Sequence, residues 1–91
     1  MFYAIFAHDK PGALETRKAN RDAHLAYIAQ TGVVAQAGPL LDARGDMAGS
    51  LVILDVADMD AAHAWADADP YARAGLFASV DIHPWKRVIG G

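Results

Sequence analysis

Apolar positions along the chain change their period several times, and each change predicts a new element. FYAIFA, residues 2–7, is an unbroken apolar run that stops at the turn-forming sequence His-Asp-Lys-Pro-Gly, as expected for a short strand. The spacing then becomes helical, and one predicted stripe carries Leu14, Arg21, Leu25 and Ile28. Gly32 offers the left-handed stop typical of a helix C-terminus. The first third of the chain therefore predicts a strand followed by a long helix.

The remaining pattern predicts two more strands, a second helix and a final strand. Residues 33–37 and 50–56 are short apolar runs, separated by Gly38-Pro39 and a polar loop. Asp58 can cap the following helix, whose predicted inner face carries Ala62, Trp65, Ala66 and Asp69. The last run, residues 79–89, is predicted to lie at a sheet edge, because Pro84 has no N–H to donate.

The order strand, helix, strand, strand, helix, strand predicts one ferredoxin-like α+β domain over residues 1–91, with a four-stranded antiparallel sheet. Both helices would cover one face of this sheet. FYAIFA, VVA and LVIL are nevertheless apolar at odd and even positions alike, so both faces should be covered. We therefore expect a homodimer in which two sheets meet face to face.

Composition narrows the function classes. The net charge is −3 and no run of Lys or Arg is present, so neither nucleic acid nor an anionic membrane surface is an expected partner. The absence of cysteine excludes a disulfide scaffold. The N-terminal apolar run is too short for a secretory signal or a membrane span, which favours a cytoplasmic location. Small molecules and other proteins remain as partners.

His24 is a polar residue on or beside the inner stripe of the first predicted helix, where a structural helix would carry Leu or Ala. A lone histidine at such a position is more often a hydrogen-bonded core residue than a catalyst. Arg21 on the same predicted face makes a purely structural role of His24 harder to explain, because two inward groups that can carry positive charge require acceptors. A polar cleft that holds an anion or a carboxylate is one way to supply them.

Asp69 has a structural explanation of its own. As an N-cap before Pro70, with Gly75 beyond, it would bracket a short helix PYARA. The same carboxylate could also meet His24 if the two helices pack side by side. A His-Asp pair would fix the imidazole tautomer and make it a general acid or base. The sequence leaves both roles of Asp69 open.

These residues belong to a larger set in which the chain resembles the YciI-like (YCII-related) proteins over essentially its whole length. The matching segments are Asp9-Lys10-Pro11, Arg21 with His24, Ala37-Gly38-Pro39, Gly49-Ser50, Asp69-Pro70-Tyr71, Gly75-Leu76-Phe77, and Ile82 with Pro84-Trp85. The resemblance implies a dimeric α/β barrel and an active site centred on His24 and Asp69. It further implies proton-transfer or elimination chemistry, such as dehydrochlorination, on small and often aromatic substrates without a redox cofactor.

The other candidate residues define the rest of the expected site. Ser50, Arg21 and Tyr71 are predicted to hold a small anionic or phenolic substrate. His8, His63 and His83 show no metal-ligand spacing, so no metal is expected, and no GxGxxG or phosphate-binding glycine order is present. We therefore expect a cofactor-independent enzyme. A non-catalytic ligand-binding or accessory domain and a barrel monooxygenase stay open as alternatives.

Overall fold

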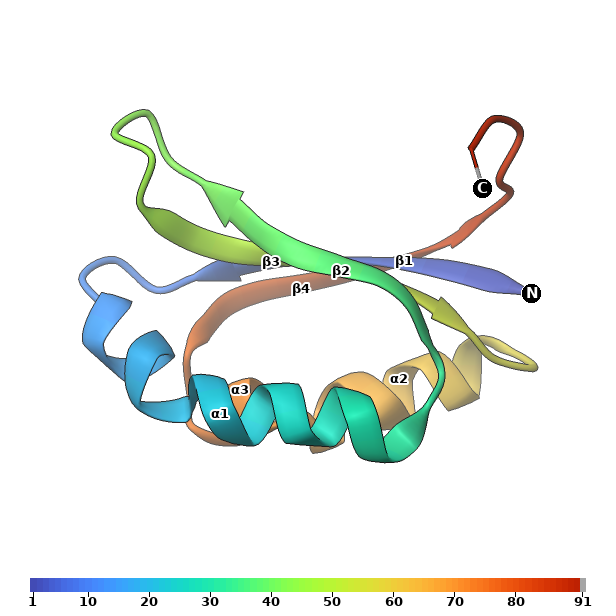
Figure 1. Ribbon diagram of the computed structural model, residues 1–91, viewed down its shortest axis with the longest axis horizontal. Helices are drawn as coiled ribbons and strands as arrows, with labels where there is room; N and C mark the ends of the chain where they lie inside the picture. Colours follow the sequence, from blue (N-terminus) through green and yellow to red (C-terminus); the bar gives the residue numbers. More distant parts are fainter. Residues whose placement is uncertain (91) are drawn as a thin grey trace.

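The computed structural model describes residues 1–90 and contains a four-stranded antiparallel sheet with its helices on one face (Figure 1). The elements follow the order β1 (Phe2–Asp9), α1 (Leu14–Thr31), β2 (Val34–Leu41), β3 (Met47–Asp55), α2 (Met59–Ala68), α3 (Pro70–Arg73) and β4 (Phe77–Trp85). The spatial order of the strands is β2-β3-β1-β4. The predicted ferredoxin-like arrangement is therefore confirmed.

The strand boundaries differ from the sequence prediction in several places, and β3, for example, begins at Met47 rather than at residue 50. β2 does not end at Gly38-Pro39 but continues to Leu41, and Pro39 pairs with Ser50 of β3. Proline is tolerated there because β2 is an edge strand, where one side of the backbone needs no ladder partner. The predicted polar loop shrinks to a turn in which Asp42 Oδ1 accepts from the backbone N–H groups of Arg44 and Asp46.

β4 lies at the opposite edge, as the proline in its sequence predicts. It begins at Phe77 and ends at Trp85, so it starts before the predicted residue 79 and stops short of residue 89. Pro84 pairs with Tyr3 of β1. None of the helices within residues 1–90 combines the length and the hydropathy needed to cross a membrane.

The helix boundaries follow the predicted stop and cap signals. α1 ends at Gly32, which adopts the left-handed conformation with φ 66°. Asp58 caps α2 by accepting a 2.8 Å hydrogen bond from the backbone N–H of Ala61. Asp69 closes α2 and caps α3, with Pro70 at the first helical position. The chain therefore turns sharply between α2 and α3.

The buried side of α1 differs from the predicted apolar stripe. Leu25 is 45% exposed, and the two buried residues of this helix are polar, Arg17 and His24. These two lie seven residues apart and so face the same way. The buried stripe of α1 is rotated relative to the predicted one because polar contacts with other elements hold this helix in place.

The hydrophobic core lies between the sheet and the helices. Its buried members are Tyr3, Ile5, Val52, Leu54, Ala62 and Trp65. Each large apolar side chain buried here contributes about 1.5–3 kcal/mol to folding. Trp65 also links the helices, because its indole N–H donates to Thr31 at 3.0 Å and its carbonyl accepts from the Tyr27 hydroxyl at 2.8 Å.

Within residues 1–90 no helix lies on the other face of the sheet (Figure 1). Phe6 and Trp85 on this face are 38% and 37% exposed, and Ile53 and Leu51 lie beside them. We call this surface the open face, defined by Ala4, Phe6, Leu51, Ile53, His83 and Trp85. The apolar residues at alternate strand positions, which predicted two covered faces, therefore lie on a face that no helix within residues 1–90 covers. Only Arg87 reaches over its edge within the described residues, with the guanidinium 4.7 Å from the Phe2 ring centroid and 6.0 Å from that of Trp85.

Candidate functional site

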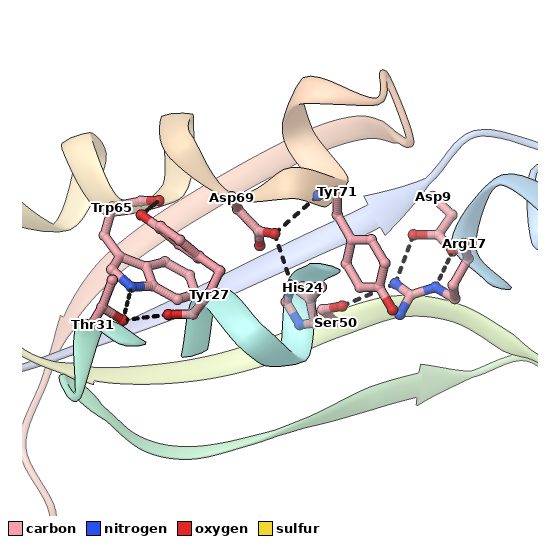
Figure 2. A network of polar contacts seen from close by, with 9 residues as sticks. All are labelled: Asp9, Arg17, His24, Tyr27, Thr31, Ser50, Trp65, Asp69 and Tyr71. Atoms are coloured by element: carbon pink, nitrogen blue, oxygen red, sulfur yellow. Dashed lines mark hydrogen bonds and ion pairs between the residues drawn. The ribbon is translucent and has the colours of Figure 1, made fainter. Parts of the chain in front are cut away.

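His24 and Asp69 meet between α1 and the junction of α2 with α3. His24 Nδ1 lies 2.8 Å from Asp69 Oδ1, and both side chains are buried. A carboxylate only accepts hydrogen bonds, so Nδ1 carries a proton in this contact, and in the neutral imidazole the lone pair is on Nε2. Nε2 is turned away from Asp69 (Figure 2). The pair is thus arranged so that one ring nitrogen is fixed and the other is free to act.

Asp69 serves as a helix cap and as the partner of His24 at the same time. Its Oδ1 accepts the 2.8 Å contact from His24 and a 3.0 Å hydrogen bond from the backbone N–H of Tyr71. The cap holds the carboxylate in position before any ligand arrives. The two interpretations left open by the sequence are therefore compatible in one side chain.

Tyr71 packs directly on the imidazole. The two rings are stacked, with centroids 3.9 Å apart and an angle of 14° between their planes. The Arg17 guanidinium carbon lies 4.7 Å from the Tyr71 ring centroid, and the ring sits between Arg17 and His24 (Figure 2). Burial raises the pKa of the Tyr71 phenol, although the charges of Arg17 and Arg21 act in the opposite direction. Tyr71 therefore stays neutral around pH 7 and limits how His24 can tilt.

A second buried ion pair, Asp9–Arg17, lies next to Tyr71. Arg17 Nε donates to Asp9 Oδ2 at 2.7 Å, and Arg17 Nη2 donates to Asp9 Oδ1 at 2.9 Å. Nη2 also donates to Ser50 Oγ at 2.9 Å. Burial disfavours the charge, but the hydrogen bond and the charge of Asp9 outweigh it and raise the pKa of Arg17. Arg17 is accordingly a permanent cation inside the molecule.

Sequence reasoning did not single out Arg17 or its contact with Asp9. The available signal was the spacing, because Arg17, Arg21 and His24 recur at four and three residues on a helix. Arg21 itself is exposed and forms part of the cleft wall, rather than pointing into the core. The buried cation of α1 is thus Arg17, one turn before the predicted one.

A cleft of about 200 Å³ lies over these groups. α1, β2 and β3 form most of its wall, and Tyr71 closes one side. The lining residues are Arg17, Arg21, His24, Leu25, Ile28, Ala37, Gly38, Pro39, Met47, Ser50, Val52 and Tyr71. All the predicted site residues except Asp69 line it, and Asp69 reaches it through His24.

Gly49 determines how closely the strand that carries Ser50 can approach β1. A Cβ atom at this position would clash with the backbone oxygen of Ala7. Only glycine fits this approach without a backbone shift. Among residues 1–90 no group of three or more His, Cys, Asp or Glu side chains is placed to hold a metal ion.

Comparison with known proteins finds the YCII-related domain over residues 1–86. The chain is 41% identical to the protein YciI of Escherichia coli, across 97% of this chain and 99% of that protein. An uncharacterized protein of Haemophilus influenzae is 38% identical over the same shares.

Among solved structures, the 5-chloro-2-hydroxyhydroquinone dehydrochlorinase TftG of Burkholderia phenoliruptrix, in complex with 2,5-dihydroxybenzoquinone, is similar to this chain. It is 36% identical, with a TM-score of 0.88 and 94% coverage of both chains. A crystal structure of an antibiotic biosynthesis monooxygenase has a TM-score of 0.61 at 14% identity, covering 98% of this chain and all of that one. At that identity the likeness concerns the fold alone.

Proposed function

The chain belongs to the YCII-related domain family, and from that premise we propose that it is a cofactor-independent enzyme that moves a proton on a small aromatic substrate. The observation that carries the proposal is the 2.8 Å contact between His24 and Asp69 beneath the cleft. A base needs a lone pair that faces the reacting group, and Nε2 of His24 provides one. A redox cofactor is not required, since the electrons are rearranged within the substrate.

In this proposal His24 is the base and Asp69 orients it. The substrate reacts as its keto tautomer, in which one hydroxyl proton has moved to the ring carbon that carries chlorine. Nε2 takes the proton of a second hydroxyl, and the electron pair left behind forms a new carbonyl and shifts a ring double bond onto the carbon that carries chlorine. A leaving group such as chloride departs with its bonding pair. The imidazolium, stabilised by Asp69, then returns its proton to water, so the step is a net elimination of HCl.

The cleft favours a single substituted ring as the substrate. Cavities of about 150 Å³ hold benzene, and this cleft is somewhat larger, with Arg21, Ser50 and Tyr71 at hand for polar substituents. TftG, which is similar in sequence and fold, is described as a dehydrochlorinase of a chlorinated hydroxyhydroquinone. We therefore place phenolic and chlorinated hydroxyquinol compounds first among the substrates to test.

The test measures chloride release from 5-chloro-2-hydroxyhydroquinone by the wild type and by His24→Gln. We expect the variant to be slower by about 10²- to 10⁴-fold, the usual contribution of a general base. His63→Gln, an exposed histidine of α2, is the matched control and should be unaffected. Chloride release that persists undiminished in His24→Gln would contradict the assignment of the base.

A ligand-binding or accessory role in the same cleft is the alternative, favoured by the apolar wall that Leu25, Ile28 and Val52 contribute. Binding of phenolic compounds at His24 in NMR spectra, with no turnover of any of them, would support it. Oxygen consumption with a phenolic substrate would instead indicate a monooxygenase.

We also propose that two copies associate through the open face. Its apolar residues, Phe6 and Trp85 among them, form a groove of about 270 Å³ that a second sheet could fill. A charged residue at its centre, Leu51→Asp, should convert the dimer into a monomer in light scattering, whereas Ala19→Asp on the exposed side of α1 should not. A wild-type protein that stays monomeric at micromolar concentration would overturn this.

A further inference from the structure

The Ser50 hydroxyl lines the cleft, and its oxygen already accepts a hydrogen bond from within the protein. Arg17 Nη2 donates to Ser50 Oγ at 2.9 Å, and a guanidinium has donors only. Ser50 must therefore be the acceptor in this bond and keeps its own proton. No acceptor for that proton is found within residues 1–90, and Ser50 lines the cleft. The proton is thus available to a molecule bound there.

Arg17 cannot rotate away from this arrangement. Two of its nitrogens are held by the two oxygens of Asp9, and the side chains of the pair are only 3% and 5% exposed. The Tyr71 ring covers the guanidinium at 4.7 Å. A buried bidentate pair is geometrically specific because both partners are planar. The direction of the Arg17 to Ser50 bond is consequently fixed before a ligand enters.

The cleft thereby presents two hydrogen-bonding groups of opposite kind. His24 Nε2 offers a lone pair, because the Asp69 carboxylate accepts from Nδ1. Ser50 offers a proton, because Arg17 supplies the donor to its oxygen. A ligand that satisfies both groups needs an acidic hydrogen at one position and an acceptor oxygen at another.

We propose that Arg17, held by Asp9, is a positioning residue that makes Ser50 a hydrogen-bond donor to an acceptor oxygen of the ligand. The site then selects ring compounds that carry an ionisable hydroxyl together with a carbonyl or oxyanion, rather than simple phenols. This inference rests on the proposed location of the active site, but it concerns binding and requires no turnover.

The first test measures the dissociation constant of 2,5-dihydroxybenzoquinone by calorimetry in a double-mutant cycle. Ser50→Ala should weaken binding about tenfold, the effect of losing one hydrogen bond to a polar or charged partner. Arg17→Lys, which keeps the charge opposite Asp9, should weaken binding in the wild type and add nothing in the Ser50→Ala background. Arg44→Lys, in the turn between β2 and β3, is the matched control.

The outcomes of the double-mutant cycle distinguish a positioning role of Arg17 from direct contact with the ligand. If the effects of Arg17→Lys and Ser50→Ala add, Arg17 contacts the ligand itself and the positioning role is wrong. An unchanged affinity in Ser50→Ala, or no binding of the quinone to the wild type, would also overturn the proposal. Binding without chloride release would leave it intact while removing the catalytic function, so the two failures are distinguishable.

The second test does not depend on an Arg17 variant that folds. Phenol has one hydroxyl and no oxygen at a second ring position, so it lacks the separate acceptor that the proposal assigns to Ser50. Ser50→Ala should therefore leave the NMR-derived affinity for phenol unchanged while it weakens 2,5-dihydroxybenzoquinone about tenfold. An equal loss for both probes would mean that Ser50 acts through packing, and the proposal would fail.

Discussion

The two buried acids of the site, Asp9 and Asp69, are used in opposite ways. Both oxygens of Asp9 accept hydrogen bonds from Arg17, in a pair that has no exposed reactive atom. Asp69 makes both of its contacts through one oxygen, and its histidine keeps a free nitrogen. The first pair holds elements together, whereas the second prepares a group for chemistry. A buried ion pair therefore has to be judged by its unused atoms as well as by its distance.

Asp9→Asn should have the largest effect on stability. The amide can offer only one oxygen, so its NH₂ group would face a donor nitrogen of Arg17 and leave a buried cation incompletely paired. Breaking a buried pair in this way costs about 3–5 kcal/mol of unfolding free energy. Urea unfolding followed by circular dichroism measures it. A loss under 1 kcal/mol would remove the distinction between the two acids.

Asp69→Asn is the matched change and should cost only about 1 kcal/mol of unfolding free energy. The single oxygen of the amide can keep both contacts that Oδ1 makes, and Asn caps helices as well as Asp does. Chloride release should nevertheless fall, because a neutral amide stabilises the imidazolium less than a carboxylate. A variant as unstable as Asp9→Asn would show that Asp69 is chiefly structural.

Gly49→Ala should lower the unfolding free energy by an amount between those of the two Asp variants. It should act near the Asp9–Arg17–Ser50 contacts, because Gly49 precedes Ser50 in β3. The added methyl would meet the Ala7 carbonyl and must push β3 away from β1, at a cost of about 1–3 kcal/mol. Ser50 moves with the strand, so binding of 2,5-dihydroxybenzoquinone should weaken as well. Gly38→Ala, where a methyl meets nothing within 4 Å, is the control for the unfolding free energy.

The smallest expected effect appears at alkaline pH. Burial raises the pKa of Tyr71 and that of Tyr27 above the ordinary value of 10.0, the latter with a further contribution from Asp69. The neutral phenols therefore favour the folded state, a contribution that is full below pH 10 and lost as pH rises through the raised values. Unfolding free energy measured between pH 9 and 11 should fall, and it should fall less in Tyr71→Phe.

The sequence predicted the topology and marked His24 and Asp69 as candidates from local signals, whereas their pairing was implied by the family resemblance. Strand and helix periods alternate in the ferredoxin-like order, and His24 interrupts an otherwise regular helix. Asp69 was visible as a cap before Pro70. These signals lie within a few residues of the feature that they predict.

The Asp9–Arg17–Ser50 contacts left no such trace. Arginine is long and usually exposed, so its position on a helix does not reveal whether its end turns inward. The contacts join three elements, and their geometry depends on how α1 lies over the sheet. The predicted second strand is too short for a related reason. Proline ends a central strand, and only the order of strands in the sheet shows that β2 is an edge strand in which Pro39 is tolerated.

The two tryptophans of the chain lie on opposite sides of the sheet, Trp65 in the core and Trp85 on the open face. Indole emission shifts to shorter wavelength when the ring leaves water, so each ring reports a different event. In single-tryptophan variants, with Phe at the other position, the fluorescence would report on one side of the sheet at a time. Emission from Trp65 would follow the opening of the helical layer, while emission from Trp85 would follow the meeting of two sheets as the protein is diluted or concentrated.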